Sequence, residues 1–322
     1  MDSNSLVPQI VEKLWPRLLR LEKQRKKIVV SIYRNILIGA FITLLAFWFS
    51  PVTSLIVFPF IALIGYLSFK SRYVDYVSRF KHGVIREIIT LINPFLRYTP
   101  KGCIAQYHYI NSKLFDPDIS KYRGEDLIEG TIKPTKDGES KGDQGSTNVK
   151  FSEIFAQKEM GNRKNKKSVT VFRGLFFVAD FNKRLTGTTI LKPDLAEKLL
   201  GHFGTILQDS NLMQNGELVK LENPEFEEHF VVYSTDQQEA RYILSSQIME
   251  RILWFKQKTD QRVYMSFNKK HVYVGISGGN DRFEPSLFQT LLRNELFEQY
   301  ITDIELMLGL VEDLNLNRRI WH

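Results

Sequence analysis

The longest apolar run in the chain indicates how it is organised. Residues 35–69 form a run of 35 positions without a charged side chain, bounded by Arg34 and Lys70. One helix needs about 20 residues to cross a hydrocarbon core about 30 Å thick, so this run is too long for one span and long enough for two. Proline lacks a backbone donor and disfavours helix in the residue before it. Ser50-Pro51 therefore predicts a turn between two helices, at about residues 28–49 and 52–69.

Basic residues stand on both sides of this run, and the predicted turn carries none. The positive-inside rule places both ends of the hairpin, and the domain that follows it, in the cytoplasm. Arg34 lies within a turn or two of the interface, where its long side chain can extend outward to water. The predicted membrane-flanking residues are Lys23, Arg25, Lys26, Lys27, Arg34, Lys70 and Arg72, and the predicted membrane turn is Ser50 with Pro51. Two alternatives stay open, a hairpin that enters one leaflet without crossing and a buried hairpin of a soluble protein.

Helical periodicity continues on either side of the hairpin. In residues 1–27, apolar positions recur at spacings of three and four beside basic residues, which predicts an amphipathic helix that lies on the anionic inner leaflet or packs on another helix. Pro16 is expected to interrupt it. Residues 28–70 are the hairpin, and residues 71–100 are predicted to be a helical stalk ending near Asn93-Pro94. The apolar stripe of the first helix consists of Ile10, Leu14, Leu18 and Leu21.

Shorter apolar runs follow from residue 101 to residue 322, the predicted cytosolic domain. Residues 148–159 and 167–183 read as two long strands of an antiparallel hairpin, and residues 262–277 as a second hairpin. Residues 133–147, low in apolar side chains and rich in Gly and Ser, predict a flexible loop. Strands and helices occur in runs rather than in regular alternation. This order favours an α+β fold with a mainly antiparallel sheet flanked by helices, following an N-terminal transmembrane helical hairpin.

Composition narrows the chemistry. The single cysteine, Cys103, excludes an internal disulfide or a multi-thiolate metal site, and the six histidines show no zinc-binding spacing. No cofactor and no metal is predicted. The net charge of +8 is concentrated in residues 1–35 and 70–101, while residues 102–322 carry a net charge of −2. A basic excess that flanks an apolar run makes a lipid bilayer the expected partner and argues against nucleic acid.

A polar cluster lies between two apolar runs in "FVVYSTDQQEARYIL", residues 230–244. It reads as a strand that ends where a helix begins. Asp236 followed three residues later by Glu239 fits a capping box, which satisfies backbone donors at a helix start and needs no catalytic role. The alternative is an acidic/Arg site assembled by folding from Asp180, Asp236, Glu239 and Arg241.

Four segments in order carry a resemblance to a known family: "FRGLFFVADFNK", the long stretch from "LENPEFEEHF" to "SSQIMERIL", "FEPSLF" and "VEDLNLNRRIW". Together they resemble the bacterial family catalogued as domain of unknown function 3137, over about residues 70–322. The resemblance implies a pair of membrane spans near the amino terminus followed by one cytosolic domain. It implies no catalytic residues.

We therefore expect a protein of the bacterial cytoplasmic (inner) membrane with both termini and the large domain in the cytosol. The favoured function is a non-enzymatic binding or scaffolding module that engages a protein partner or lipid headgroups. Self-association through the hairpin is left open, because small residues allow helices to approach closely. The alternative is a hydrolase or transferase at the membrane surface. The small residues are Gly39, Ala40, Ala46, Ala62 and Gly65.

Overall fold

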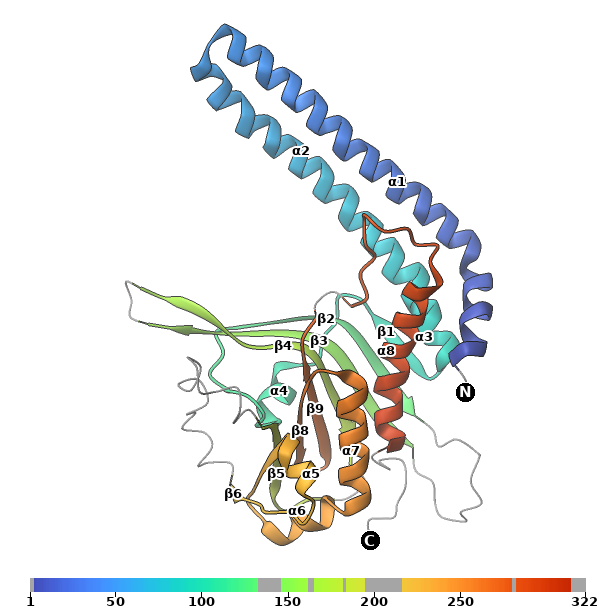
Figure 1. Ribbon diagram of the computed structural model, residues 1–322, viewed down its shortest axis with the longest axis vertical. Coiled ribbons are helices and arrows are strands. Elements are labelled where there is room, and N and C mark those ends of the chain that lie inside the picture. The colour runs from blue at the N-terminus through green and yellow to red at the C-terminus, as the bar shows by residue number, and fades with distance from the viewer. Residues whose placement is uncertain are drawn as a thin grey trace. The chain divides into compact units, whose positions relative to one another are not determined.

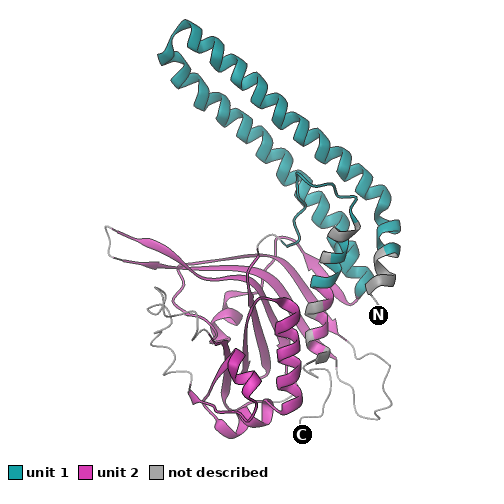
Figure 2. Cartoon of the chain, viewed as in Figure 1, with its two compact units in different colours: residues 1–92, 282–303 teal, residues 93–281, 304–322 magenta. Residues whose placement is uncertain are grey.

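The computed structural model describes residues 3–132, 146–161, 165–181, 184–194, 216–279 and 282–313. The chain divides into two compact units, Met1–Ile92 with Arg282–Asp303 and Asn93–Asp281 with Ile304–His322 (Figure 2). The fold is α+β, as the sequence predicts. The expected domain boundaries differ from this division, because the stretch Arg282–Asp303 belongs to the first unit rather than to the C-terminal domain.

Two long helices form most of the first unit. Helix α1 (Ser3–Phe49) and helix α2 (Pro51–Phe80) run side by side (Figure 1), and α2 continues through a π-helical turn, η1 (Lys81–Ile85), into α3 (Arg86–Ile92). The chain reverses at Ser50, whose Oγ accepts a hydrogen bond from the Val52 amide at 3.3 Å. Pro51 fills the first position of α2, where the missing N–H costs no helical bond.

The two helices expose large apolar side chains along the uncharged stretch. Trp48 is 86% exposed, Phe49 85% and Leu55 75%. Both helices are long and apolar enough to cross a membrane by length and composition. A contiguous apolar surface of this size marks a protein-binding or membrane-binding region.

The expected interruption at Pro16 does not occur, since α1 runs through both Pro8 and Pro16. Packing explains the difference. Every residue of the predicted apolar stripe is buried. The free energy gained from this burial offsets the loss of the helical hydrogen bond that each proline removes. Arg17 adds a hydrogen bond from its Nη1 to the Gly83 carbonyl at 3.1 Å, which ties α1 to η1. The buried stripe is Ile10, Leu14, Leu18 and Leu21, and the buried residues of the predicted stalk include Phe80, Val84 and Ile88.

The second unit contains a nine-stranded, entirely antiparallel sheet with the strand order β1-β2-β3-β4-β9-β8-β5-β7-β6. Its strands are β1 (Leu96–Thr99), β2 (Lys121–Ile132), β3 (Thr147–Met160), β4 (Lys167–Asp180), β5 (Thr188–Pro193), β6 (Glu217–Leu218), β7 (Phe230–Ser234), β8 (Arg262–Asn268) and β9 (His271–Ser277). The helices between them are α4 (Gln106–Asn111), α5 (Pro224–His229), α6 (Gln237–Ile243) and α7 (Ser246–Thr259). Helix α8 (Asn294–Asp313) follows, with its residues to Asp303 in the first unit.

Both predicted hairpins are present, β3 with β4 and β8 with β9. Along β4, successive side chains are buried on both faces of the sheet, which matches the apolar pattern on both alternating sets of positions. One face packs on α4 and its flanks through Tyr109, Phe172 and Phe176. The central strands are therefore covered on both faces.

The predicted flexible loop lies largely outside the described residues. Of this loop, at residues 133–147, only the end is described, and Thr147 already begins β3. Strand β2 begins at Lys121 and passes through a bulge between Glu125 and Ile128. Asp126 adopts a φ of 58° there, a conformation that a strand pattern does not suggest.

Candidate functional sites

The polar stretch at residues 230–244 is a strand end and a helix start, as predicted. Strand β7 ends at Ser234, and Asp236 caps α6 by accepting hydrogen bonds from the amides of Gln238 and Glu239 at 3.0 and 2.9 Å. The Asp236 amide donates to Ser234 Oγ at 3.1 Å. The buried Ser234 hydroxyl therefore acts as a hydrogen-bond acceptor for the backbone.

Glu239 has a different role from the one a capping box assigns it. Its carboxylate accepts hydrogen bonds from the amides of Thr186 and Gly187 at 3.1 and 2.8 Å, and so holds the segment that leads into β5. Arg241 lies on the exposed side of α6. Asp236 and Glu239 therefore lie together at the start of α6, and the carboxylate of each accepts hydrogen bonds from backbone amides.

Asp180, the fourth residue of the proposed acidic/Arg site, lines a different pocket of about 430 Å³ beside β3, β4 and β9. Asn148 Nδ2 donates to its Oδ2 at 2.8 Å, and His271 Nε2 lies 3.7 Å from its Oδ1. His108, which is 4% exposed, also lines this pocket, and its Nε2 lies 2.6 Å from the Tyr107 hydroxyl. The sequence reasoning missed both histidines as pocket residues, because they are 163 positions apart.

Burial favours the neutral form of both histidines. Burial lowers the pKa of His108 to about 4, with further contributions from Lys150 and His271, while Asp180 opposes the shift. Burial also lowers the pKa of His271, again against Asp180. Neutral imidazoles can donate one hydrogen bond and accept another. The two histidines therefore give this pocket hydrogen-bonding groups and add little positive charge to it.

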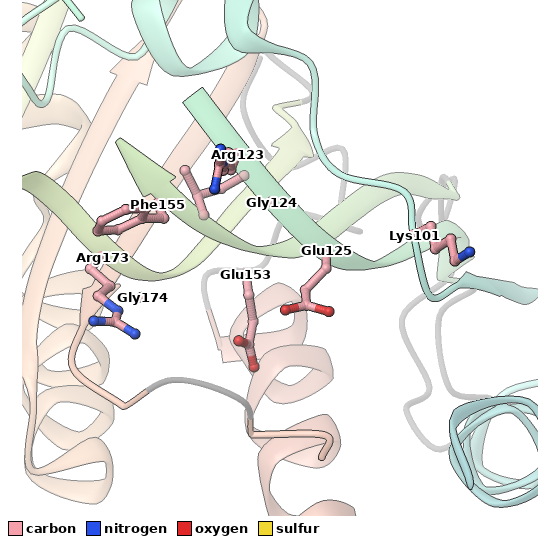
Figure 3. Close-up of a pocket in the computed structure, with 9 residues that line it drawn as sticks. Lys101, Arg123, Gly124, Glu125, Glu153, Phe155, Arg173 and Gly174 are labelled. Carbon is pink, nitrogen blue, oxygen red and sulfur yellow. The ribbon is translucent and has the colours of Figure 1, made fainter. Parts of the chain in front are cut away.

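A second pocket, of about 420 Å³, lies on β2, β3 and β4 (Figure 3). Glu125 and Glu153 are direct cross-strand partners, and Figure 3 shows their carboxylates beside each other. With Asp126 they place three carboxylate oxygens within 4.8 Å of one another, the type of donor set that a hard divalent cation prefers. Lys101, Arg123 and Arg173 line the same pocket.

Asp126 is buried at the bulge of β2 and accepts a hydrogen bond from the Tyr98 hydroxyl. Burial first, and then the nearby Asp126 carboxylate, raise the pKa of Tyr98 well above its usual value. Tyr98 therefore stays protonated and acts as a donor. Sequence reasoning missed this cluster, because Glu125 and Glu153 become neighbours only through the register of β2 on β3. The sequence of the long connection between these strands does not predict that register.

In the first unit, several of the predicted membrane-flanking residues gather in one pocket of about 420 Å³. Arg72 Nη1 donates to Ser31 Oγ at 2.7 Å, which joins α2 to α1. Lys23 and Lys70 are exposed, and Lys70 Nζ lies 5.9 Å from the centre of the Tyr66 ring. The lining residues are Lys26, Lys27, Val30, Ser31, Arg34 and Arg72.

Arg25 forms hydrogen bonds with other residues of the first unit. Its guanidinium donates to both carboxylate oxygens of Glu22 at 2.6 and 2.9 Å, and its Nη1 donates to the Leu287 carbonyl at 2.6 Å. The same Glu22 accepts a hydrogen bond from the Leu291 amide at 3.1 Å. This partly buried pair therefore fastens residues 287–291 to α1.

Further along the hairpin, an apolar pocket of about 520 Å³ lies between α1 and α2. Gly39 packs closely there, since a Cβ at this position would meet Ile61 Cγ2 at 3.1 Å. At Gly65, no neighbouring atom of the described residues would lie within 4 Å of an added Cβ. The missing side chain of Gly39 therefore allows α1 to pack closely on α2 within the same chain. Phe288, 74% exposed, also lines this pocket.

These features define a class of protein: an α+β protein whose N-terminal helical hairpin is apolar on its exposed surface. Residues 170–316 match the family described as protein of unknown function (DUF3137). The match extends from β4 to beyond α8 and confirms the resemblance over that range. No curated protein matches the sequence.

One solved structure shows a distant likeness, the crystal structure of the mycobacterial trehalose monomycolate transport factor A, TtfA. The alignment covers 74% of this chain and 97% of that chain, with 10% sequence identity and a TM-score of 0.34. A likeness of this degree supports no statement about what this chain binds.

Proposed function

We propose that this protein is a membrane-anchored module that binds a partner through its sheet-containing unit and acts as an accessory or scaffold rather than as an enzyme. The apolar hairpin holds it in the bacterial cytoplasmic membrane, and the second unit lies in the cytosol. The exposed apolar surface of α1 and α2 is the observation that carries the anchoring.

The polar stretch at residues 230–244 supports the non-enzymatic part of the proposal. Its serine, aspartate and glutamate satisfy backbone donors at 2.8–3.1 Å. Groups committed in this way are poor nucleophiles or bases, because activity would require them to give up those bonds.

Membrane fractionation tests the anchoring. We expect the full-length protein to sediment with membranes after lysis, to remain there after high-salt and alkaline washes, and to enter the supernatant only with detergent. Replacing three exposed apolar residues with Asp, at Leu37, Leu44 and Leu55, should release it, because a charge in the hydrocarbon core is costly. Equivalent changes at exposed Tyr107, Tyr242 and Trp254 of the second unit form the control. Release of the unaltered protein by the salt wash would refute the proposal.

A further inference from the structure

We propose that the basic pocket between α1 and α2 binds the phosphate group of an anionic phospholipid. This inference rests on the proposed membrane anchoring and adds a lipid class and a site to it. The pocket is lined by Lys26, Lys27, Val30, Ser31, Arg34 and Arg72.

The pocket is built by the fold rather than by a run of sequence. Arg72 comes from α2 and the other lining residues from α1. The hydrogen bond from Arg72 Nη1 to Ser31 Oγ fixes the guanidinium against α1 while it uses one of five N–H donors. A guanidinium held in a fixed position matches the geometry of phosphate oxygens better than a freely moving cation does.

The charge of the pocket favours an anion. Among the described residues that line it, four carry a positive charge and none is acidic. Glu22 Oε1 lies 3.9 Å from Lys26 Nζ, but the same carboxylate already receives two hydrogen bonds from Arg25. The four cations repel one another, and a bound phosphate would relieve that repulsion.

The position of the pocket along the hairpin distinguishes a lipid from a soluble phosphate. Arg34 is the last charged residue before the uncharged stretch, and Arg72 follows its far end by three residues. The phosphate groups of a bilayer lie at this boundary between apolar and charged side chains. Val30, 64% exposed, and Leu37, 70% exposed, offer apolar surface beside the cations on which the rest of a lipid can lie.

Native mass spectrometry of the full-length protein in detergent provides the test. We expect phosphatidylglycerol to bind in preference to phosphatidylcholine. The double variant Lys27→Gln with Arg34→Gln should weaken phosphatidylglycerol binding about tenfold, because it removes two of four phosphate-facing charges. The matched control, Lys23→Gln with Lys70→Gln, removes two charges from the same flanks outside the pocket and should leave binding within about twofold.

Neither Lys27 nor Arg34 takes part in the Arg72–Ser31 bond, so the hairpin should keep its structure, which circular dichroism and gel filtration can verify. Equal loss in both double variants would overturn the proposed pocket in favour of general surface charge. Binding of inorganic phosphate without a preference for phosphatidylglycerol would overturn the lipid as its ligand. A protein that stays in membranes after alkaline washing yet shows no lipid preference would refute this inference alone, whereas release by salt would refute the anchoring itself.

Discussion

At the scale of single residues, His108 is the buried group with the clearest consequence for stability. Its imidazole is 4% exposed, and its pKa lies near about 4 in the folded chain against 6.5 ordinarily. Between these values the unfolded chain binds a proton that the folded chain does not, so protons favour unfolding there. The stability that neutral His108 contributes is complete above pH 6.5 and is lost as the pH falls towards about 4.

Thermal unfolding of the second unit should therefore occur at lower temperature as the pH falls from about 7.5 to about 4.5. His108→Gln should lower the melting temperature at neutral pH, because it loses buried contacts, and should flatten its decline in acid. His82→Gln, a change at an exposed histidine, serves as control. An equally steep decline in the His108→Gln variant would assign the acid sensitivity to other groups, with His271 the next to replace.

Single residues also show which side-chain roles can be predicted from the sequence. Asp236 could be assigned as a helix cap, because the cap and the amides it accepts from lie within three residues. Glu239 could not be assigned correctly, since its partners are 52 and 53 residues away at Gly187 and Thr186. The cluster of Glu125, Asp126 and Glu153 was missed for the same reason: a strand register brings it together.

At the scale of elements, α1 shows how packing overrides local propensity. A proline inside a helix costs about 3 kcal/mol or more, which is why Pro16 predicts an interruption. Burial of the stripe that includes Leu14 and Leu18 offsets this cost, because each buried leucine contributes about 1.5–3 kcal/mol. The sequence showed the stripe but not the surface that covers it.

The contact of α1 with residues 287–291 can be tested through Glu22. Glu22→Ala would leave Arg25 partly buried without its carboxylate, a change that costs about 3–5 kcal/mol in buried pairs. It would also remove the acceptor of the Leu291 amide. Hydrogen–deuterium exchange of peptides covering residues 285–293 should become faster, and the double variant Glu22→Ala with Arg25→Ala should recover part of the protection. Glu12→Ala, at an exposed position of α1, should change nothing, and unaltered exchange in Glu22→Ala would refute this fastening role.

At the scale of the whole molecule, the fold class was predictable and the division into units was not. Periodicity and turn residues predicted the apolar hairpin, the two strand hairpins and the antiparallel sheet, all of which depend on neighbours in the sequence. The first unit instead joins Met1–Ile92 to Arg282–Asp303. Contacts between segments about 200 residues apart, such as Tyr73 with Glu284, leave no periodic signal in either segment.

The lengths of the two helical arms bear on how the hairpin sits in a bilayer. Residues 35–49 of α1 form an uncharged arm about 22 Å long, and residues 51–69 of α2 an arm about 28 Å long. A hydrocarbon core is about 30 Å thick, so a full crossing requires the membrane-spanning part of α1 to begin near residue 28, with the Arg34 side chain extending to the headgroups. We expect the full crossing, because Arg34 is exposed and can extend in this way.

Cysteine labelling in intact cells or spheroplasts tests this expectation. Cys103 is the sole cysteine, so Cys103→Ser removes the background. On that background, Phe49→Cys at the hairpin tip should react with a membrane-impermeant maleimide applied from outside, because a crossing hairpin presents its turn there. Lys269→Cys, in the exposed turn between β8 and β9, should react only after the membrane is permeabilised. Reaction of Phe49→Cys only after permeabilisation would mean that the hairpin enters one leaflet and returns, and reaction of Lys269→Cys from outside would reverse the predicted orientation.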